Sequence, residues 1–313
     1  MRWVMILVLA LTIGAPAWAN DALKVGTPEP VAFVFAALDV GIRSGIFEKH
    51  ALDVTRVDFA GGAKLHQAIA AGAIDAAVGT GSDLLFIAKG APERAVAAYG
   101  NDLAALSVQV RAADPTLKTV SDLRGKTVGT TTPGSFTTWL ARQVSIHQGW
   151  GPDGFKLAYL GAQSGLVAGL MAKDVDAIVG TTAGGLQLQK EGKVRVLRTM
   201  ARIVPDFISG MLYASDRLIN DRPDVLRRFL AGWFETARLI RANKAETIRL
   251  TQPDTKVPDD IAAEIYDEEA PTFFTEGRFD RKKLAAVKQS LIDTGVIASM
   301  PPDDALINES FLP

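Results

Sequence analysis

The tripeptide Val-Gly-Thr occurs four times in this chain, each time at the end of a short apolar run and before a predicted helix. The copies stand at residues 25–27, 78–80, 128–130 and 179–181. A single copy is explained well enough as a turn glycine followed by a helix-capping threonine. Four copies in equivalent contexts predict four strand ends that meet at one ligand-binding crevice, because open α/β sheets bind ligands outside the carboxyl ends of their strands.

The four copies fall on two similar halves of the sequence. Residues 68–80 align with residues 169–181, and residues 25–33 align with residues 128–136. The chain of 313 residues has room for two domains of ~100–200 residues each. We therefore expect an α/β fold made of two similar lobes in tandem, with helices flanking an open sheet in each lobe.

Short apolar runs predict the strands of both lobes, near residues 23–26, 52–59, 76–78, 127–129, 156–160, 177–179 and 194–197. Two further apolar segments, 105–110 and 207–214, are predicted to cross between the lobes as a two-segment hinge. The first lobe is expected to contain residues 20–107 and 208–313, and the second lobe residues 108–207.

The last part of the chain changes to long predicted helices. Asp221 and Pro223 signal a helix start, and apolar residues fall on one face of this helix as far as Ala242. Helices near 259–269 and 280–294 follow with acidic starts that suit the helix dipole. We expect this tail to pack on the first lobe.

The N-terminus has the pattern of a secretory signal peptide. Arg2 precedes an apolar stretch at 3–13, and Ala17-Trp18-Ala19 is a small-x-small cleavage site. The apolar stretch is shorter than the ~20 residues that a membrane-spanning helix needs. We expect export to the periplasm, with cleavage after Ala19.

Composition and motifs exclude several kinds of chemistry. With 34 Lys and Arg against 35 Asp and Glu, the chain lacks the basic surplus that nucleic-acid binding favours. It has no Cys, which excludes disulfides and thiolate sites, and its three histidines (His50, His66, His147) are too scattered for a catalytic or metal site. Residues 125–127 resemble the end of a P-loop, but Val120 stands where a glycine is required. We therefore expect no enzyme activity, cofactor or metal.

The loop within residues 128–140 is the clearest candidate for contact with a ligand. It joins an apolar strand to a helix through a stretch rich in Gly, Thr and Ser. The first NH groups of a helix lack intrahelical partners and carry a partial positive charge. Thr131, Thr132 and Ser135 are therefore predicted to surround an acidic group at the helix start.

Three segments carry a resemblance to a known family: 39–85, beginning DVGIRSGIFEKH; 122–135, DLRGKTVGTTTPGS; and 222–246, beginning RPDVLRRFLAGW. Together they resemble the periplasmic solute-binding proteins of the sulfonate, taurine and nitrate ABC-importer group (SsuA/THI5-like, NMT1-like). The group also contains binders of thiamine pyrimidine precursors and of aromatic carboxylates. The resemblance implies a periplasmic binding protein-like fold, which closes on its ligand and docks on a membrane permease driven by an ATPase subunit.

The resemblance also implies a function and a set of contact residues. The expected function is to bind a small organic anion, such as a sulfonate or carboxylate, between the lobes of a monomer. Carried over by position, the ligand-binding residues are Thr27, Glu29, Phe33, Gly61, Thr80 and Ser82 from one lobe, and Thr131, Thr132, Ser135, Phe136, Thr181 and Thr182 from the other.

Two alternatives stay open. Glu29 places a carboxylate beside a site suited to anions, where a like charge weakens binding; we expect it to point to solvent, unless the ligand carries an amino group or another donor. The alternative function is that of a binder of thiamine pyrimidine precursors or of a THI5-like pyrimidine synthase. The cysteine-rich, iron-linked chemistry of that enzyme finds no support in a chain without Cys.

Overall fold

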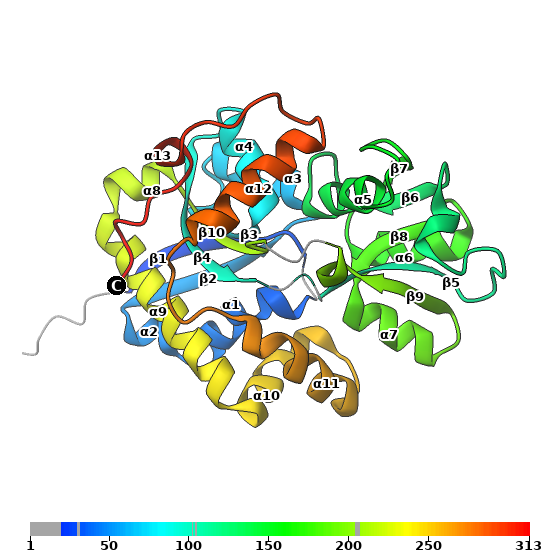
Figure 1. The fold of residues 1–313 in the computed structure, drawn as a ribbon. Helices are drawn as coiled ribbons and strands as arrows, with labels where there is room; N and C mark the ends of the chain where they lie inside the picture. The colour runs from blue at the N-terminus through cyan, green and yellow to red at the C-terminus, as the bar shows by residue number, and fades with distance from the viewer. Residues whose placement is uncertain (1–19, 30–31, 102, 104, 204–206) are drawn as a thin grey trace, which may run out of the picture.

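The computed structural model describes residues 20–29, 32–101, 103, 105–203 and 207–313. The predicted signal peptide at residues 1–19 lies outside them. The chain forms two five-stranded mixed sheets, each flanked by helices, in two halves that lie side by side (Figure 1). The predicted α/β fold with two open mixed sheets is confirmed. We call the half around the sheet that contains β1 the first lobe, and the other half the second lobe.

The sheet of the first lobe consists of β1 (Asp21–Thr27), β2 (Leu52–Asp58), β3 (Ala76–Thr80), β4 (Glu93–Gly100) and β10 (Gly210–Ser215). Its strand order is β2-β1-β3-β10-β4. Strand β1 is parallel to β2 and β3, whereas β10 is antiparallel to both of its neighbours. Every residue of β3 is buried, as expected for an inner strand between layers of helices.

The sheet of the second lobe repeats this plan with β5 (Leu106–Arg111), β6 (Thr127–Thr130), β7 (Lys156–Tyr159), β8 (Ala177–Thr181) and β9 (Val194–Thr199). Its order is β7-β6-β8-β5-β9. The register repeats as well, because Val25 faces Ala76 in the first sheet and Val128 faces Ala177 in the second. The two halves aligned from the sequence are therefore structural repeats.

The chain passes between the lobes twice, from β4 to β5 and from β9 to β10. The strand that follows each passage is antiparallel to a neighbour in its sheet: β5 to β8 in the second lobe, and β10 to β3 in the first. The two passages also leave and enter at neighbouring strands: Gly100 pairs with Gly210 in the first sheet, and Ser107 pairs with Thr199 in the second. The predicted crossing segments correspond to β5 and to the entry into β10.

Helices cover both sheets. In the first lobe they are α1 (Phe33–Arg43), α2 (Ile46–Lys49), α3 (Gly62–Ala70) and α4 (Leu84–Ala88), and in the second lobe α5 (Phe136–His147), α6 (Gln163–Ala172) and α7 (Thr182–Lys190). The tail adds α8 (Asp216–Asp221), α9 (Pro223–Ala242), α10 (Lys244–Thr255), α11 (Asp259–Glu269), α12 (Arg281–Asp293) and α13 (Asp303–Leu306). No helix in the described part of the chain is long and apolar enough to cross a membrane.

The tail packs on the first lobe through α9, as predicted. Pro223 begins this helix, and its apolar face buries Phe229, Trp233 and Phe234. Helices α11 and α12 match the predicted positions, whereas the sequence analysis did not predict α8 and α10. Helix α10 is polar and contains Pro253, and these two features hide it from a search for apolar periodicity.

The tail also contacts the second lobe, which the sequence analysis did not predict. Helix α11 lies against α7, where the Lys190 ammonium is 3.3 Å from the Asp260 carboxylate. On the other side of the molecule, the Arg142 guanidinium of α5 donates to the Thr294 carbonyl oxygen over 3.0 Å, just after α12. In Figure 1, α12 and α11 lie above and below the boundary between the two lobes.

Candidate ligand-binding site

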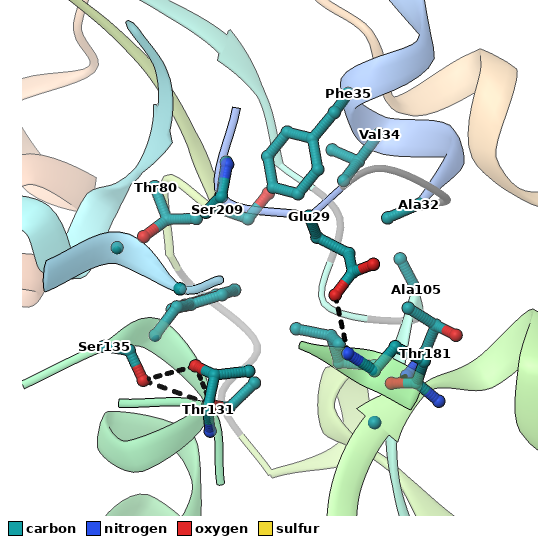
Figure 2. A pocket seen from close by; sticks show the side chains of 18 of the residues that line it. Glu29, Ala32, Val34, Phe35, Thr80, Ala105, Thr131, Ser135, Thr181 and Ser209 are labelled. Atoms are coloured by element: carbon teal, nitrogen blue, oxygen red, sulfur yellow. Dashed lines mark hydrogen bonds between the residues drawn. The ribbon is translucent and has the colours of Figure 1, made fainter. Parts of the chain in front are cut away.

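A cavity of about 760 Å³, open in part to solvent, lies between the lobes at the carboxyl ends of the parallel strands (Figure 2). We call it the main cavity. The first lobe contributes Pro28, Glu29, Ala32, Val34, Phe35, Gly61, Gly62, Thr80, Asp83, Tyr99 and Ser209. The second lobe contributes Ala105, Leu106, Thr131, Ser135, Phe136, Thr137, Gln163, Leu166, Gly180 and Thr181.

The loops after all four Val-Gly-Thr copies converge on the main cavity. Thr80, Thr131 and Thr181 lie in its wall. Thr27 does not, because its fully buried hydroxyl donates to the Asp58 carboxylate over 2.7 Å. The residues that follow Thr27, among them Glu29, reach the cavity instead.

Hydroxyl groups gather where helix α5 begins. The Thr131 hydroxyl donates to the Ser135 hydroxyl over 2.8 Å, and the Thr131 NH donates to the Thr137 hydroxyl over 2.9 Å. Ser135 is the N-cap residue, yet its side chain makes no capping hydrogen bond to the first turn of α5. No side-chain cap therefore takes up the first NH groups of this helix, and Phe136 and Thr137, which carry two of them, line the main cavity.

The start of helix α6 already has an acceptor, which is Glu29. The Glu29 carboxylate accepts a hydrogen bond from the Gln163 NH over 2.8 Å, and Glu29 is only 9% exposed. The Arg56 guanidinium holds the same loop by donating to the Glu29 carbonyl oxygen over 3.1 Å. The prediction that Glu29 points to solvent is therefore wrong, because the partial positive charge of a helix start attracts the carboxylate into the cleft.

The wall of the main cavity contains two carboxylates, Glu29 and Asp83, and no Lys or Arg among its described residues. Its larger side chains are mostly apolar, among them Val34, Phe35 and Leu166. An acid bound here would therefore rely on hydroxyl and NH groups, while its apolar part would contact the aliphatic and aromatic side chains.

A buried charged triad supports the Thr80 loop. On α3, the His66 imidazole has Nδ1 2.8 Å from the Glu93 carboxylate and Nε2 3.2 Å from the Asp83 carboxylate. Burial on its own would lower the pKa of His66, but Glu93 and Asp83 raise it to about 10. Asp83 also accepts from the Thr80 NH over 2.7 Å. His66 thus acts on the cavity wall through Asp83.

Gly61 and Thr132 bring the lobes close together. Gly61 has a φ of +97°, and a Cβ atom there would lie 2.6 Å from the Thr132 hydroxyl oxygen. Only glycine suits this combination of backbone angle and close approach. Thr132 itself lies beside the main cavity and not in its wall, and its buried hydroxyl has no hydrogen-bond partner among the described residues.

The other predicted site residues divide in two groups. Phe136 lies in the wall and stacks on Trp139, with ring centroids 5.5 Å apart. Phe33, Ser82 and Thr182 lie outside the wall of the main cavity. Phe33 packs against aromatic rings of the tail, the Ser82 hydroxyl lies 3.2 Å from that of Thr80, and Thr182 is buried at the start of α7.

Sequence reasoning missed much of the wall, including Val34, Phe35, Tyr99, Leu106, Gln163 and Ser209. Gln163 could have been found from the sequence. When the internal alignment of 68–80 with 169–181 is extended, Gln163 pairs with Gly62, the residue after the predicted site residue Gly61. The two residues begin the equivalent helices α3 and α6. In the described part of the chain, no group of three or more His, Asp or Glu is arranged to hold a metal ion.

Comparison with solved structures supports the fold. A protein from Bordetella bronchiseptica RB50 is 20% identical over 94% of this chain and 96% of its own, with a TM-score of 0.81. The alkanesulfonate-binding protein SsuA from Xanthomonas axonopodis pv. citri, bound to MOPS, is 18% identical over 93% of this chain and 100% of its own (TM-score 0.78). The nitrate-binding protein NrtA from Synechocystis PCC 6803 is 15% identical over 93% and 87% (TM-score 0.74). Comparison with curated proteins gives no match.

A family model gives the assignment. The model described as "NMT1/THI5 like" matches residues 32–246, which is more than half of the chain and includes loops from both lobes around the main cavity. The resemblance seen in the sequence agrees with this match, and so does the fold of the solved SsuA and NrtA proteins. The protein therefore belongs to the NMT1/THI5-like family.

Proposed function

We propose that this protein is the solute-binding component of an ABC import system and binds a small organic anion in the main cavity. The observation that carries the proposal is the start of helix α5, which has no side-chain cap and is surrounded by the hydroxyls of Thr131, Ser135 and Thr137 in a cavity lined by both lobes. A sulfonate or carboxylate placed there would accept hydrogen bonds from NH and hydroxyl groups and interact favourably with the helix dipole.

The cavity wall favours an acid with an apolar body. The oxyanion would occupy the polar corner at α5, while Val34, Phe35 and Leu166 would contact carbon atoms. An inorganic anion at α5 would leave these apolar side chains without a contact. The Xanthomonas SsuA, whose solved structure holds MOPS, binds an organic sulfonate of this general kind.

The setting that we propose for this activity follows the family resemblance. Residues 1–19 would direct export and be removed, leaving a periplasmic monomer that begins at Asn20. The first lobe would move against the second lobe about the two crossing segments, from β4 to β5 and from β9 to β10. The closed, loaded protein would then dock on a permease coupled to an ATPase subunit.

Calorimetry with a panel of alkanesulfonates, aromatic sulfonates and carboxylates tests the proposal. We expect at least one acid to bind saturably at a single site, and Ser135→Ala to weaken that binding. A panel in which no acid binds, while a neutral or cationic solute does, would contradict the assignment.

The second candidate, thiamine pyrimidine chemistry, is kept because the matching family is named for THI5-like members. A precursor binder would use the same cavity. A synthase would instead consume a bound substrate, so turnover of pyridoxal phosphate by the purified protein separates the enzyme from either binder.

A further inference from the structure

A second cavity adjoins the main cavity on the side of helices α7, α10 and α11. It has a volume of about 620 Å³, which includes space open to solvent, and we call it the side chamber. Ala32, Ala105, Gln163 and Thr181 line both spaces, so these four residues form the boundary, which we call the junction, between the two cavities. In Figure 2, Ala32, Ala105 and Thr181 lie together, away from Ser135 at the start of α5.

The junction between the cavities has small side chains and a donor group without a partner. Two of its four residues are alanines. Gln163 is 91% buried, its Oε1 accepts from the Thr181 NH over 3.2 Å, and its Nε2 has no hydrogen-bond partner among the described residues. A buried amide donor left in this way costs free energy, and an acceptor atom of a ligand that passes the junction would remove that cost.

The far side of the chamber differs in charge from the start of α5. Val257 and Ile265 give it an apolar wall, and its polar groups include the Gln187 amide and the Glu269 carboxylate. No Lys or Arg is found among its described lining residues. A second acidic group would be repelled here, whereas a neutral polar group or an amine would be accepted.

We propose that the ligand is elongated, with its acid at the start of α5, its apolar body in the main cavity and a neutral polar or amine-bearing tail in the side chamber. The inference rests on the proposed function and narrows its substrate class. It assigns Gln187 and Gln163 to recognition of the tail, and Thr131 and Ser135 to recognition of the acid.

Calorimetry on a matched series of sulfonates tests this inference. The series runs from ethanesulfonate to octanesulfonate, each with a terminal methyl, amine or carboxylate. Each methylene that leaves water should strengthen binding about fourfold. We expect this gain in affinity to continue for chains that are long enough to pass the junction. For those long chains, a terminal amine should keep the gain, whereas a terminal carboxylate should cancel it.

Substitution at Gln187 separates the side chamber from the main cavity. Gln187→Trp fills the chamber, so it should weaken long amine-bearing sulfonates about tenfold or more and leave ethanesulfonate unchanged. Gln189→Trp, the same exchange on an exposed part of α7 outside both cavities, should change neither. Gln187→Leu is a milder second variant. If Gln187→Trp fails to fold, the dependence of affinity on chain length in the wild-type protein still tests the inference.

The outcomes distinguish the two proposals. If short acids bind but longer chains add nothing in the wild-type protein, the side chamber takes no part, and this inference is wrong while the proposed function stands. Equal loss of short and long acids in Gln187→Trp would lead to the same conclusion. If neither this series nor any carboxylate of the first panel binds, both proposals are wrong.

Discussion

The Glu29 carboxylate and the Gln163 backbone NH form a hydrogen bond of 2.8 Å although they belong to opposite lobes. One group is a negative charge from the loop after β1, and the other is the first NH of helix α6. The bond therefore joins the lobes across the cleft and places a negative charge at the start of α6, where the helix dipole favours it.

Removing this bond should favour separation of the lobes. A hydrogen bond to a charged group contributes about 1.5–3 kcal/mol, so Glu29→Ala should raise the population of open molecules in the absence of ligand. Small-angle scattering should then show a larger radius of gyration than for the wild-type protein. Glu48→Ala, at an exposed carboxylate of the first lobe, is the control. The same radius for all three proteins would contradict the role of Glu29.

Removing a hydroxyl at the start of α5 should weaken binding of the acid. Thr131→Ala and Ser135→Ala should each cost about 1–2 kcal/mol, or roughly five- to thirtyfold in affinity, as for hydrogen bonds to a charged group. Thr119→Ala is the control, because Thr119 caps an exposed turn outside both cavities, and it should lose up to about 1 kcal/mol of stability but no affinity. Calorimetry with a ligand from the acid panel makes the measurement. Unchanged affinity in both site variants would place the acid elsewhere.

The buried His66 should make stability depend on alkaline pH. Its folded pKa of about 10 lies above the unfolded value near 6.5, so its stabilising contribution is complete below pH 6.5 and is lost as pH rises towards 10. At ~1.4 kcal/mol per pKa unit, the free energy of unfolding should fall by something on the order of 5 kcal/mol. Urea unfolding across this range measures the fall, and NMR titration of the imidazole measures the pKa. A ring that titrates near pH 6.5 in the folded protein would disprove the paired arrangement with Asp83 and Glu93.

Ligand binding should close the molecule. The main cavity has walls from both lobes, and between its described elements the chain crosses from one lobe to the other twice, from β4 to β5 and from β9 to β10. Scattering at saturating ligand should therefore give a smaller radius of gyration than scattering without ligand. An unchanged profile at saturation would indicate a binding mode without movement of the lobes.

The exported protein should begin at Asn20. The expected cleavage follows the Ala17-Trp18-Ala19 pattern, and N-terminal sequencing of protein recovered from the periplasm of a Gram-negative host measures it. Recovery of an intact chain from the membrane fraction would refute this prediction.

The repeated Val-Gly-Thr ends were enough to predict the two sheets, because a strand end and the helix after it are local features. The roles of individual hydroxyls were not local. Thr27 and Thr80 each end a Val-Gly-Thr copy, yet Thr27 donates to Asp58, 31 residues away, and of the two only Thr80 lies in the cavity wall. Nothing near Thr27 in the sequence shows that its hydroxyl is already paired.

Contacts between the lobes were the hardest to predict. Glu29 and Gln163 are 134 residues apart, and they meet only because the lobes close to one particular geometry. The side chamber depends in the same way on the packing of α7 against the tail helix α11. The sequence pattern of a single helix or strand carries no information about contacts between the lobes.

Because Gly100 pairs with Gly210, strands β4 and β10 are the two arms of an antiparallel hairpin whose turn has been replaced by the whole second lobe. The second lobe is thus an inserted domain, and all five strands of its sheet have been synthesised before β10 emerges. The second lobe can therefore complete its sheet during translation before β10 is made. The first sheet is incomplete until then, because β10 lies between β3 and β4. A short loop that joins β4 directly to β10 would preserve the pairing of the first sheet, so the first lobe is a candidate for excision as a separate, ligand-free miniature.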